Sequence, residues 1–265
     1  MFTCNRILFP VDFSERCERA IPLVQSMAAR FGAEVTLLHV AESPLESPGA
    51  KGMVDLELFG AGRWDTAKLV RVVETGDPAA KILAAAEAFR PGLIMLPTHG
   101  YGVFRRWLLG SVTAKLLHDL RIPVWTDAHL EETPAPRNLD IRRIVCALNL
   151  EDSSVPLLRW AAAFAGAWTA ELRIVHAIPA AEHLAGQPDE PFSRFLLDTG
   201  RRMLAGIQQQ AGAHAQAIVT GGEISGTVAR LSEEWKADLI IAGRGQLRSH
   251  AYAIIRDSPC PVITV

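Results

Sequence analysis

A glycine-rich stretch, THGYGVFRRWLLGS (residues 98–111), follows a short apolar run and ends at the start of a helical pattern. Gly100 and Gly110 lack a Cβ, so the backbone there can turn sharply and bring N–H groups close to a ligand. Gly110, Ser111 and Val112 lie where free N–H groups and the helix dipole attract an anion. This chemistry suits a phosphate group. The alternative is an ordinary turn in which Ser111 serves only as a helix N-cap.

Asp12 is a second candidate for polar chemistry, because it follows the first apolar run, RILFPV. Its carboxylate can accept a hydrogen bond from a ribose hydroxyl or help to hold a metal ion bound to phosphates. Its alternative role is to cap the first helix together with Ser14. The turn VDFSE contains no glycine, and the chain has no GxxxxGK. The familiar dinucleotide-binding and nucleoside triphosphatase motifs therefore match poorly.

The elements that must position these residues alternate between apolar runs and helical patterns. Such alternation, with runs that are apolar throughout, indicates a parallel sheet covered by helices on both faces, in a doubly wound α/β arrangement. Ligands bind such sheets beyond the carboxyl ends of the strands, where the strand order reverses. The expected strands are 6–11, 35–40, 68–73, 93–96 and 123–127, with helices over 16–31, 79–89 and 112–120. Asp12, Val40 and the 98–111 loop should therefore converge at one edge of the sheet.

The sequence contains this unit twice. A shift of 137 residues sets Asp12 over Asn149, and AEVTLLHV (33–40) over AELRIVHA (170–177). We predict one domain over 1–128 and a second over 141–265. The segment 129–140, rich in prolines and charges, is the predicted linker.

The second copy departs from the first at the positions suited to phosphate. Asn149 carries no charge where the first copy has an aspartate, and the connection before the last helix is eight residues shorter. Arg248 and Ser249 stand where a Gly-Ser pair would be needed. We therefore expect the second domain to lack the arm that could wrap a triphosphate. In the variable region, a helix with an apolar stripe is predicted over 191–211, whereas prolines and glycines break the equivalent pattern in the first copy.

Composition excludes several classes of partner. The formal net charge of −2 gives no electrostatic case for nucleic acid or an anionic membrane. No apolar run approaches the roughly 18 residues that span a bilayer, and the first residues do not form a signal sequence. The four cysteines are scattered without CxxC spacing, which predicts reduced thiols and no zinc site. We expect a cytoplasmic protein.

Four short motifs together resemble the universal stress protein family: FPVD, LLHV, THG followed after nine residues by GS, and the C-terminal SPCPVITV. The resemblance covers nearly the whole chain as two tandem copies. It implies two Rossmann-like domains of the adenine nucleotide α-hydrolase kind, with ATP and Mg²⁺ bound in the first. It also implies that the two copies pair with each other through their last strands, and a homodimer is a further expectation.

The family pattern assigns the phosphate and ribose contacts to particular residues. Gly100, Gly110, Ser111 and Val112 match the positions whose backbone and side chains surround the phosphates. Asp12 matches the first-strand aspartate that faces the ribose.

The same resemblance assigns the base contacts. Pro10 and Val11 lie near the base, and Val40 matches the residue that contacts adenine. Pro97 departs from the pattern, since it replaces the first glycine and has no N–H, which leaves only its carbonyl as a contact. His99 completes the candidate set as a loop residue without a catalytic role.

The sequence favours a nucleotide-responsive binding module over a fast enzyme. It offers no evident base for an attacking water, so no catalytic residue is assigned and ATP hydrolysis is expected to be slow at most. Two alternatives stay open. One is a nucleotide-free scaffold that mediates protein interactions, and the other is an enzyme that adenylates a substrate.

Overall fold

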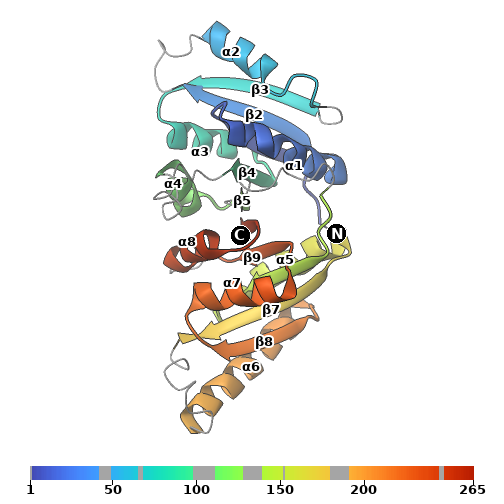
Figure 1. The fold of residues 1–265 in the computed structure, drawn as a ribbon, viewed down its shortest axis with the longest axis vertical. Helices are drawn as coiled ribbons and strands as arrows, with labels where there is room; N and C mark the ends of the chain where they lie inside the picture. Colours follow the sequence, from blue (N-terminus) through green and yellow to red (C-terminus); the bar gives the residue numbers. More distant parts are fainter. Residues whose placement is uncertain are drawn as a thin grey trace. The chain divides into compact units, whose positions relative to one another are not determined.

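The structure, a computed structural model, describes residues 2–41, 49–64, 68–97, 111–127, 139–151, 153–179, 191–244 and 248–265 (Figure 1). The chain divides into two compact units. The N-terminal unit is Thr3–Leu139, and the C-terminal unit is Asp140–Val265 together with Phe2. Each is described by itself below.

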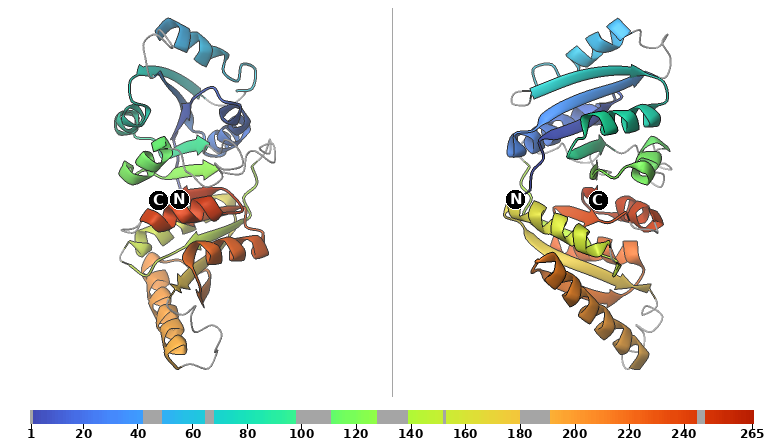
Figure 2. Two further views of the ribbon diagram at one scale, coloured as in Figure 1. Left: turned by 60° about the vertical axis from the view of Figure 1, so that its left-hand side comes forward. Right: turned by 180° about the vertical axis from the view of Figure 1, so that it is seen from behind.

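The sheet of the N-terminal unit has five parallel strands in the order β3-β2-β1-β4-β5. The order reverses between β1 and β4, which is the point where ligands enter doubly wound sheets. Right-handed crossovers account for helices on both faces, and Figure 2 shows α1 and α3 on opposite sides of the sheet. The elements are β1 Arg6–Val11, α1 Glu15–Phe31, β2 Glu34–Ala41, α2 Gly49–Leu58, β3 Lys68–Thr75, α3 Pro78–Phe89, β4 Leu93–Pro97, α4 Ser111–Asp119 and β5 Val124–Asp127.

The C-terminal unit has the same strand order, β8-β7-β6-β9-β10, again with parallel neighbours. The prediction of two tandem doubly wound α/β units is thereby confirmed. The elements are β6 Arg143–Ala147, α5 Ser154–Trp168, β7 Glu171–Ile178, α6 Pro191–Ala211, β8 Gln216–Gly221, α7 Ile224–Trp235, β9 Leu239–Ala242, α8 Arg248–Asp257 and β10 Val262–Thr264.

Local sequence signals explain where the first helix begins and ends. The Ser14 hydroxyl accepts a hydrogen bond from the Cys17 N–H at 3.4 Å, and Glu15 and Glu18 place negative charge at the positive end of the helix dipole. Gly32 ends the helix with φ of 63°, a left-handed conformation that glycine adopts without strain. The start of α1 therefore holds a fixed place directly after β1.

Each unit has its own core beneath these helices. Phe9 and Trp125 are fully buried in the sheet of the N-terminal unit. In the C-terminal unit, the buried Phe164 of α5 packs edge-to-face on Phe2 with a centroid distance of 5.1 Å, and it stacks on Trp160 at 5.3 Å. These cores support the strands whose ends carry Asp12 and Val40.

The variable region of the first copy is more regular than its sequence suggests. The prolines and glycines predicted a broken pattern, yet α2 forms over Gly49–Leu58. Both prolines, at positions 44 and 48, precede the helix, so neither interrupts it. Leu56, which is fully buried, and Phe59 anchor the segment. In the second copy, α6 has the predicted bounds of 191 and 211.

Candidate functional site

A cavity of about 390 Å³ lies in the N-terminal unit at the carboxyl edge of its sheet. Its walls come from the ends of β1, β2 and β4 and from the first turns of α1, α3 and α4. Cavities that hold drug-sized ligands have volumes of roughly 300–1,000 Å³, so a cavity of this volume is large enough for a nucleotide. The lining residues are Pro10, Val11, Asp12, Cys17, Leu38, Val40, Pro78, Ile82, Leu96, Pro97, Ser111, Val112 and Thr113.

Seven of the ten candidate residues from the sequence line this one cavity. They come from three strand ends and one helix start, as the parallel-sheet argument predicts. The three others, His99, Gly100 and Gly110, lie outside the described residues. The seven are Pro10, Val11, Asp12, Val40, Pro97, Ser111 and Val112.

Asp12 is held by two hydrogen bonds at the edge of the cavity. The Ser14 N–H and the Cys17 thiol each donate to Asp12 Oδ1, with donor–acceptor distances of 3.0 Å. Ser14 caps α1 with its own hydroxyl. The two readings of Asp12 are therefore compatible, since it supports the turn into α1 while its side chain lines the cavity.

Cys17 is a cavity residue that the sequence analysis missed. Its side chain is buried, and this burial, together with the nearby charge of Asp12, raises the pKa of the thiol. The group is therefore a neutral hydrogen-bond donor at pH 7 and a poor nucleophile. A sequence signal existed, because Cys17 lies in the first turn of the helix that Asp12 precedes. The sequence analysis, however, considered the scattered cysteines only as candidates for disulfides and metal ligands.

The start of α4 forms the side of the cavity that suits an anion. Ser111 is the first residue of the helix and is exposed, while Thr113 is buried and also lines the cavity. Lys115, one turn further, lies 3.3 Å from the Asp77 carboxylate at the start of α3. The Ala80 N–H and then Lys115 hold the pKa of Asp77 below its ordinary value. This exposed pair links the two helix starts that border the cavity.

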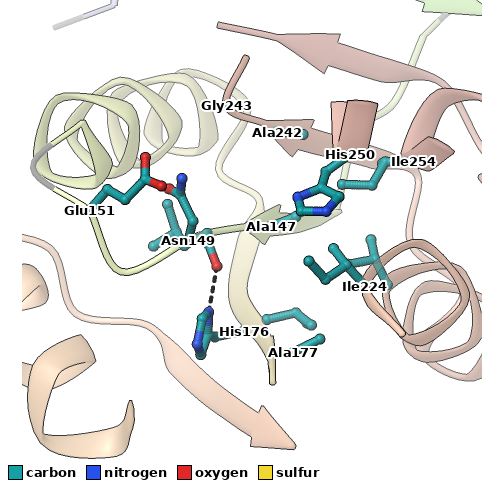
Figure 3. A pocket seen from close by; sticks show the side chains of 13 residues that line it. Ala147, Asn149, Glu151, His176, Ala177, Ile224, Ala242, Gly243, His250 and Ile254 are labelled. Carbon is teal, nitrogen blue, oxygen red and sulfur yellow. Dashed lines mark hydrogen bonds between the residues drawn. The ribbon is translucent and has the colours of Figure 1, made fainter. Parts of the chain in front are cut away.

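The C-terminal unit has an equivalent but smaller cavity, of about 130 Å³ (Figure 3). Asn149 occupies the place of Asp12, and His250 and Ile254 of α8 line the opposite side (Figure 3). Thirteen residues separate β4 from α4, whereas five separate β9 from α8. A cavity one third as large, beside a connection eight residues shorter, is consistent with the expectation that this unit lacks the arm that could wrap a triphosphate.

A carboxylate network joins the start of α7 to the end of α8 in the C-terminal unit. Glu223 accepts hydrogen bonds from the amides of Ser225 and Gly226, at 2.9 and 2.7 Å, and the Ser225 hydroxyl lies 2.6 Å from Asp257 Oδ2. Burial alone would raise the pKa of Glu223, but these hydrogen bonds outweigh it and lower the pKa. The ion pair with Arg256 lowers the pKa of Asp257.

These lowered pKa values predict a loss of stability in acid. A carboxylate with a depressed pKa in the folded state stabilises the fold fully above its ordinary pKa, near about 4, and loses that contribution as the pH falls. Glu223→Gln should cost about 0.5 kcal/mol at pH 6, a modest value because Glu223 is exposed, and less as the pH falls toward 3. Urea unfolding at both pH values measures this, with Glu233→Gln, at an exposed residue of α7, as the matched control. An equal cost at the two pH values would contradict the lowered pKa assigned to Glu223.

Two copies of a doubly wound parallel sheet, one with a nucleotide-sized cavity where its strand order reverses, define a tandem Rossmann-like α/β protein. The sequence profile of the universal stress protein family matches residues 3–126 and 140–265. The chain therefore belongs to the universal stress protein family. This confirms the resemblance found in the short motifs.

Solved structures agree in fold. A universal stress protein from Archaeoglobus fulgidus is 21% identical, with a TM-score of 0.70 over 98% of this chain and 95% of that one. A putative universal stress protein from Pseudomonas aeruginosa is 17% identical, with a TM-score of 0.67 over 99% of this chain and 93% of that one. A universal stress protein from A. fulgidus solved in complex with dAMP matches 48% of this chain and 98% of its own, at 22% identity and a TM-score of 0.38. No curated protein matches the chain.

Within the described ranges, the helices are too short or too polar to pass through a lipid bilayer.

Proposed function

We propose that the N-terminal unit binds ATP and that the chain acts as a nucleotide-responsive binding module. The observation that carries this proposal is the 390 Å³ cavity at the strand-order reversal, which brings Asp12 and the start of α4 together. An adenine nucleotide needs an apolar slot, a ribose acceptor and an anion site. The cavity combines apolar walls, a carboxylate and a helix N-terminus, which supports that class of ligand.

Different walls of the cavity suit the base, the ribose and the phosphates of the nucleotide. Pro10, Val11 and Val40 are placed to contact the base, and the Asp12 carboxylate to accept a hydrogen bond from the ribose. The phosphates would lie toward Pro97 and α4, with Ser111 and Val112 supplying donors at the helix start. His99, Gly100 and Gly110 belong to the same proposal on the basis of the family pattern.

The lining residues support binding without rapid chemistry. Among those that the structure describes, the ionisable side chains are Asp12 and Cys17. Asp12 Oδ1 already accepts two hydrogen bonds, and the raised pKa of Cys17 keeps its thiol neutral. Neither is positioned as a strong base for an attacking water. A Mg²⁺ ion would be held by the phosphates and Asp12, and would supply charge neutralisation.

Calorimetric titration of the full chain with ATP and Mg²⁺ tests the proposal. We expect one equivalent to bind per chain. No heat and no saturable shift in melting temperature would favour the nucleotide-free scaffold, and two equivalents would contradict the asymmetry between the units. Release of pyrophosphate with an acceptor would favour the adenylating enzyme. The pairing of the two copies with each other, a homodimer and a cytoplasmic location stay predictions.

Asp12→Ala should weaken ATP binding about 10- to 100-fold, because the ribose loses a charged hydrogen-bond acceptor. The thiol of Cys17 and the amide of Ser14 also lose their acceptor, so a melting curve must show that the variant is folded. Asp198→Ala removes an exposed carboxylate of α6 and is the matched control. The double change Gly110→Ala with Ser111→Ala tests the phosphate side separately. Unchanged ATP affinity in both variants would show that ATP does not bind in this cavity.

A further inference from the structure

The His39 ring lies behind the cavity of the N-terminal unit, on the other face of the sheet. β2 presents Val40 to the cavity, so the preceding residue, His39, points to the opposite face, because side chains alternate along a strand. There the ring contacts the chain on both sides of Asp12. Its Nδ1 donates a hydrogen bond of 2.9 Å to the Val11 carbonyl, and the ring packs against that of Phe13 with a centroid distance of 4.3 Å.

Phe13 has a backbone conformation that a bulky residue rarely adopts. Its φ is 60°, in the left-handed region, where a residue with a Cβ is strained. The other non-glycine residues with positive φ in the described ranges are Arg90, Thr169 and Lys236, and each of them is the C-cap of a helix, where this conformation is common. Phe13 instead lies in the turn from β1 to α1. Strain of this kind persists where the surrounding contacts hold it.

Contacts between aromatic rings hold Phe13 in this conformation. Besides His39, its ring meets the edge of the buried Phe59, which follows α2, at a centroid distance of 6.0 Å. Phe59 in turn lies 6.4 Å from Phe9, and its carbonyl accepts a hydrogen bond of 3.1 Å from the Trp64 indole. The turn between β1 and α1 is therefore tied to buried rings on the face of the sheet away from the cavity.

The C-terminal unit has one of the two contacts around this turn and lacks the other. His176 corresponds to His39, and its Nδ1 lies 2.8 Å from the Leu148 carbonyl, a hydrogen bond drawn as a dashed line in Figure 3. Leu150 corresponds to Phe13, so it offers no aromatic ring, and its φ is not left-handed. Of the two units, the one whose turn carries an aspartate has both contacts.

From these contacts we propose that His39 and Phe13 are positioning residues, which hold Asp12 at the cavity before a ligand binds. The inference rests on the proposed function, in which the Asp12 carboxylate accepts a hydrogen bond from the ribose. Asp12 is exposed directly after β1, so an unsupported turn would have to become ordered on binding, at a cost in affinity. His39 fixes the residue before Asp12 and the residue after it, so the turn is ordered in advance. Neither ring lines the cavity, so both act through Asp12.

Phe13→Leu should weaken ATP binding about fivefold, because it removes the ring and leaves the strained backbone without its support. Phe13→Tyr keeps the ring and should bind ATP within about twofold of the native chain. His39→Leu removes both contacts and should weaken binding about tenfold. His176→Leu is the matched control, because it makes the same change at the equivalent position of the other unit, and it should leave ATP affinity unchanged. Calorimetry with ATP and Mg²⁺ measures these affinities, and melting curves show that each variant is folded.

A double-mutant cycle separates positioning from general support of the fold. If Phe13 acts through Asp12, then Phe13→Leu should change ATP affinity by less than about twofold once Asp12→Ala is present. A fivefold loss in both backgrounds would mean that the ring affects ATP binding independently of Asp12, and this result would overturn the inference.

A measurement without ligand distinguishes this inference from the proposed function. The Ser14 amide donates to Asp12 Oδ1 at 3.0 Å, so its mobility reports the order of the turn. Its NMR order parameter should be about 0.85 in the native chain and in His176→Leu, and below about 0.6 in Phe13→Leu and His39→Leu. If the native chain binds no ATP, the proposed function fails, and these order parameters alone decide the inference. An unchanged order parameter in both Phe13→Leu and His39→Leu overturns it whatever ATP does.

Discussion

Val40→Trp should abolish nucleotide binding by the N-terminal unit, with a loss of affinity of more than about 100-fold. Val40 lies near the end of β2, half-buried, and its side chain lines the 390 Å³ cavity on the side proposed for the base. An indole ring there occupies the space that the base needs. The backbone of Val40 is paired in register with Glu74 of β3, which holds the new side chain at the cavity. Calorimetry with ATP and Mg²⁺ measures the loss.

The control for this variant is Val70→Trp. Val70 lies on β3, is 37% exposed and is not among the residues that line the cavity. Both variants add the same bulk to a strand of the same sheet, so a general effect of an added indole should appear in both. Full ATP affinity in Val40→Trp, with an unchanged melting temperature, would place the ligand elsewhere.

Phe164→Ala should lower the free energy of unfolding by about 3–5 kcal/mol, the usual cost of deleting a buried phenyl ring. The ring of Phe164 is fully buried in α5 and contacts the rings of Phe2, Trp160 and Trp168, at centroid distances of 5.1, 5.3 and 6.3 Å. Its removal leaves a cavity that these large, rigid rings cannot fill. Urea unfolding at neutral pH measures the change.

Phe195→Ala is the matched control for the core variant. Phe195 is 57% exposed on α6, so its truncation should change the free energy of unfolding by less than about 0.5 kcal/mol. Equal losses in the two variants would mean that Phe195 is covered in solution. A loss below about 1 kcal/mol for Phe164→Ala would contradict the core packing described above.

Much of the fold could be predicted from local patterns. Apolar runs alternating with helical periods indicated the parallel sheet, and the 137-residue shift indicated two copies. Signals at single residues also sufficed, as at Gly32, which ends α1 in a left-handed conformation. The variable region of the first copy was misread, because its prolines lie before α2 and because the burial of Leu56 depends on a surface that the sequence does not display.

The residues of the candidate site likewise include some that the sequence predicted and some that it did not. The edge of the sheet that carries Asp12, Val40 and Ser111 follows from strand direction, which is a property of the sequence pattern. The thiol of Cys17 beside Asp12 does not follow from any pattern, because it depends on how the first turn of α1 packs against β1. Pro78 and Ile82 of α3 were missed for the same reason.

By itself, the sequence determined the repeat, the strand and helix order, and the loss of the aspartate at Asn149, because each of these is a local or periodic property of the chain. Only the tertiary structure decided the volumes of the two cavities, about 390 and 130 Å³, and which side chains line them. A cavity is the space left after residues distant in sequence have packed. Its size therefore depends on all of their side chains at once.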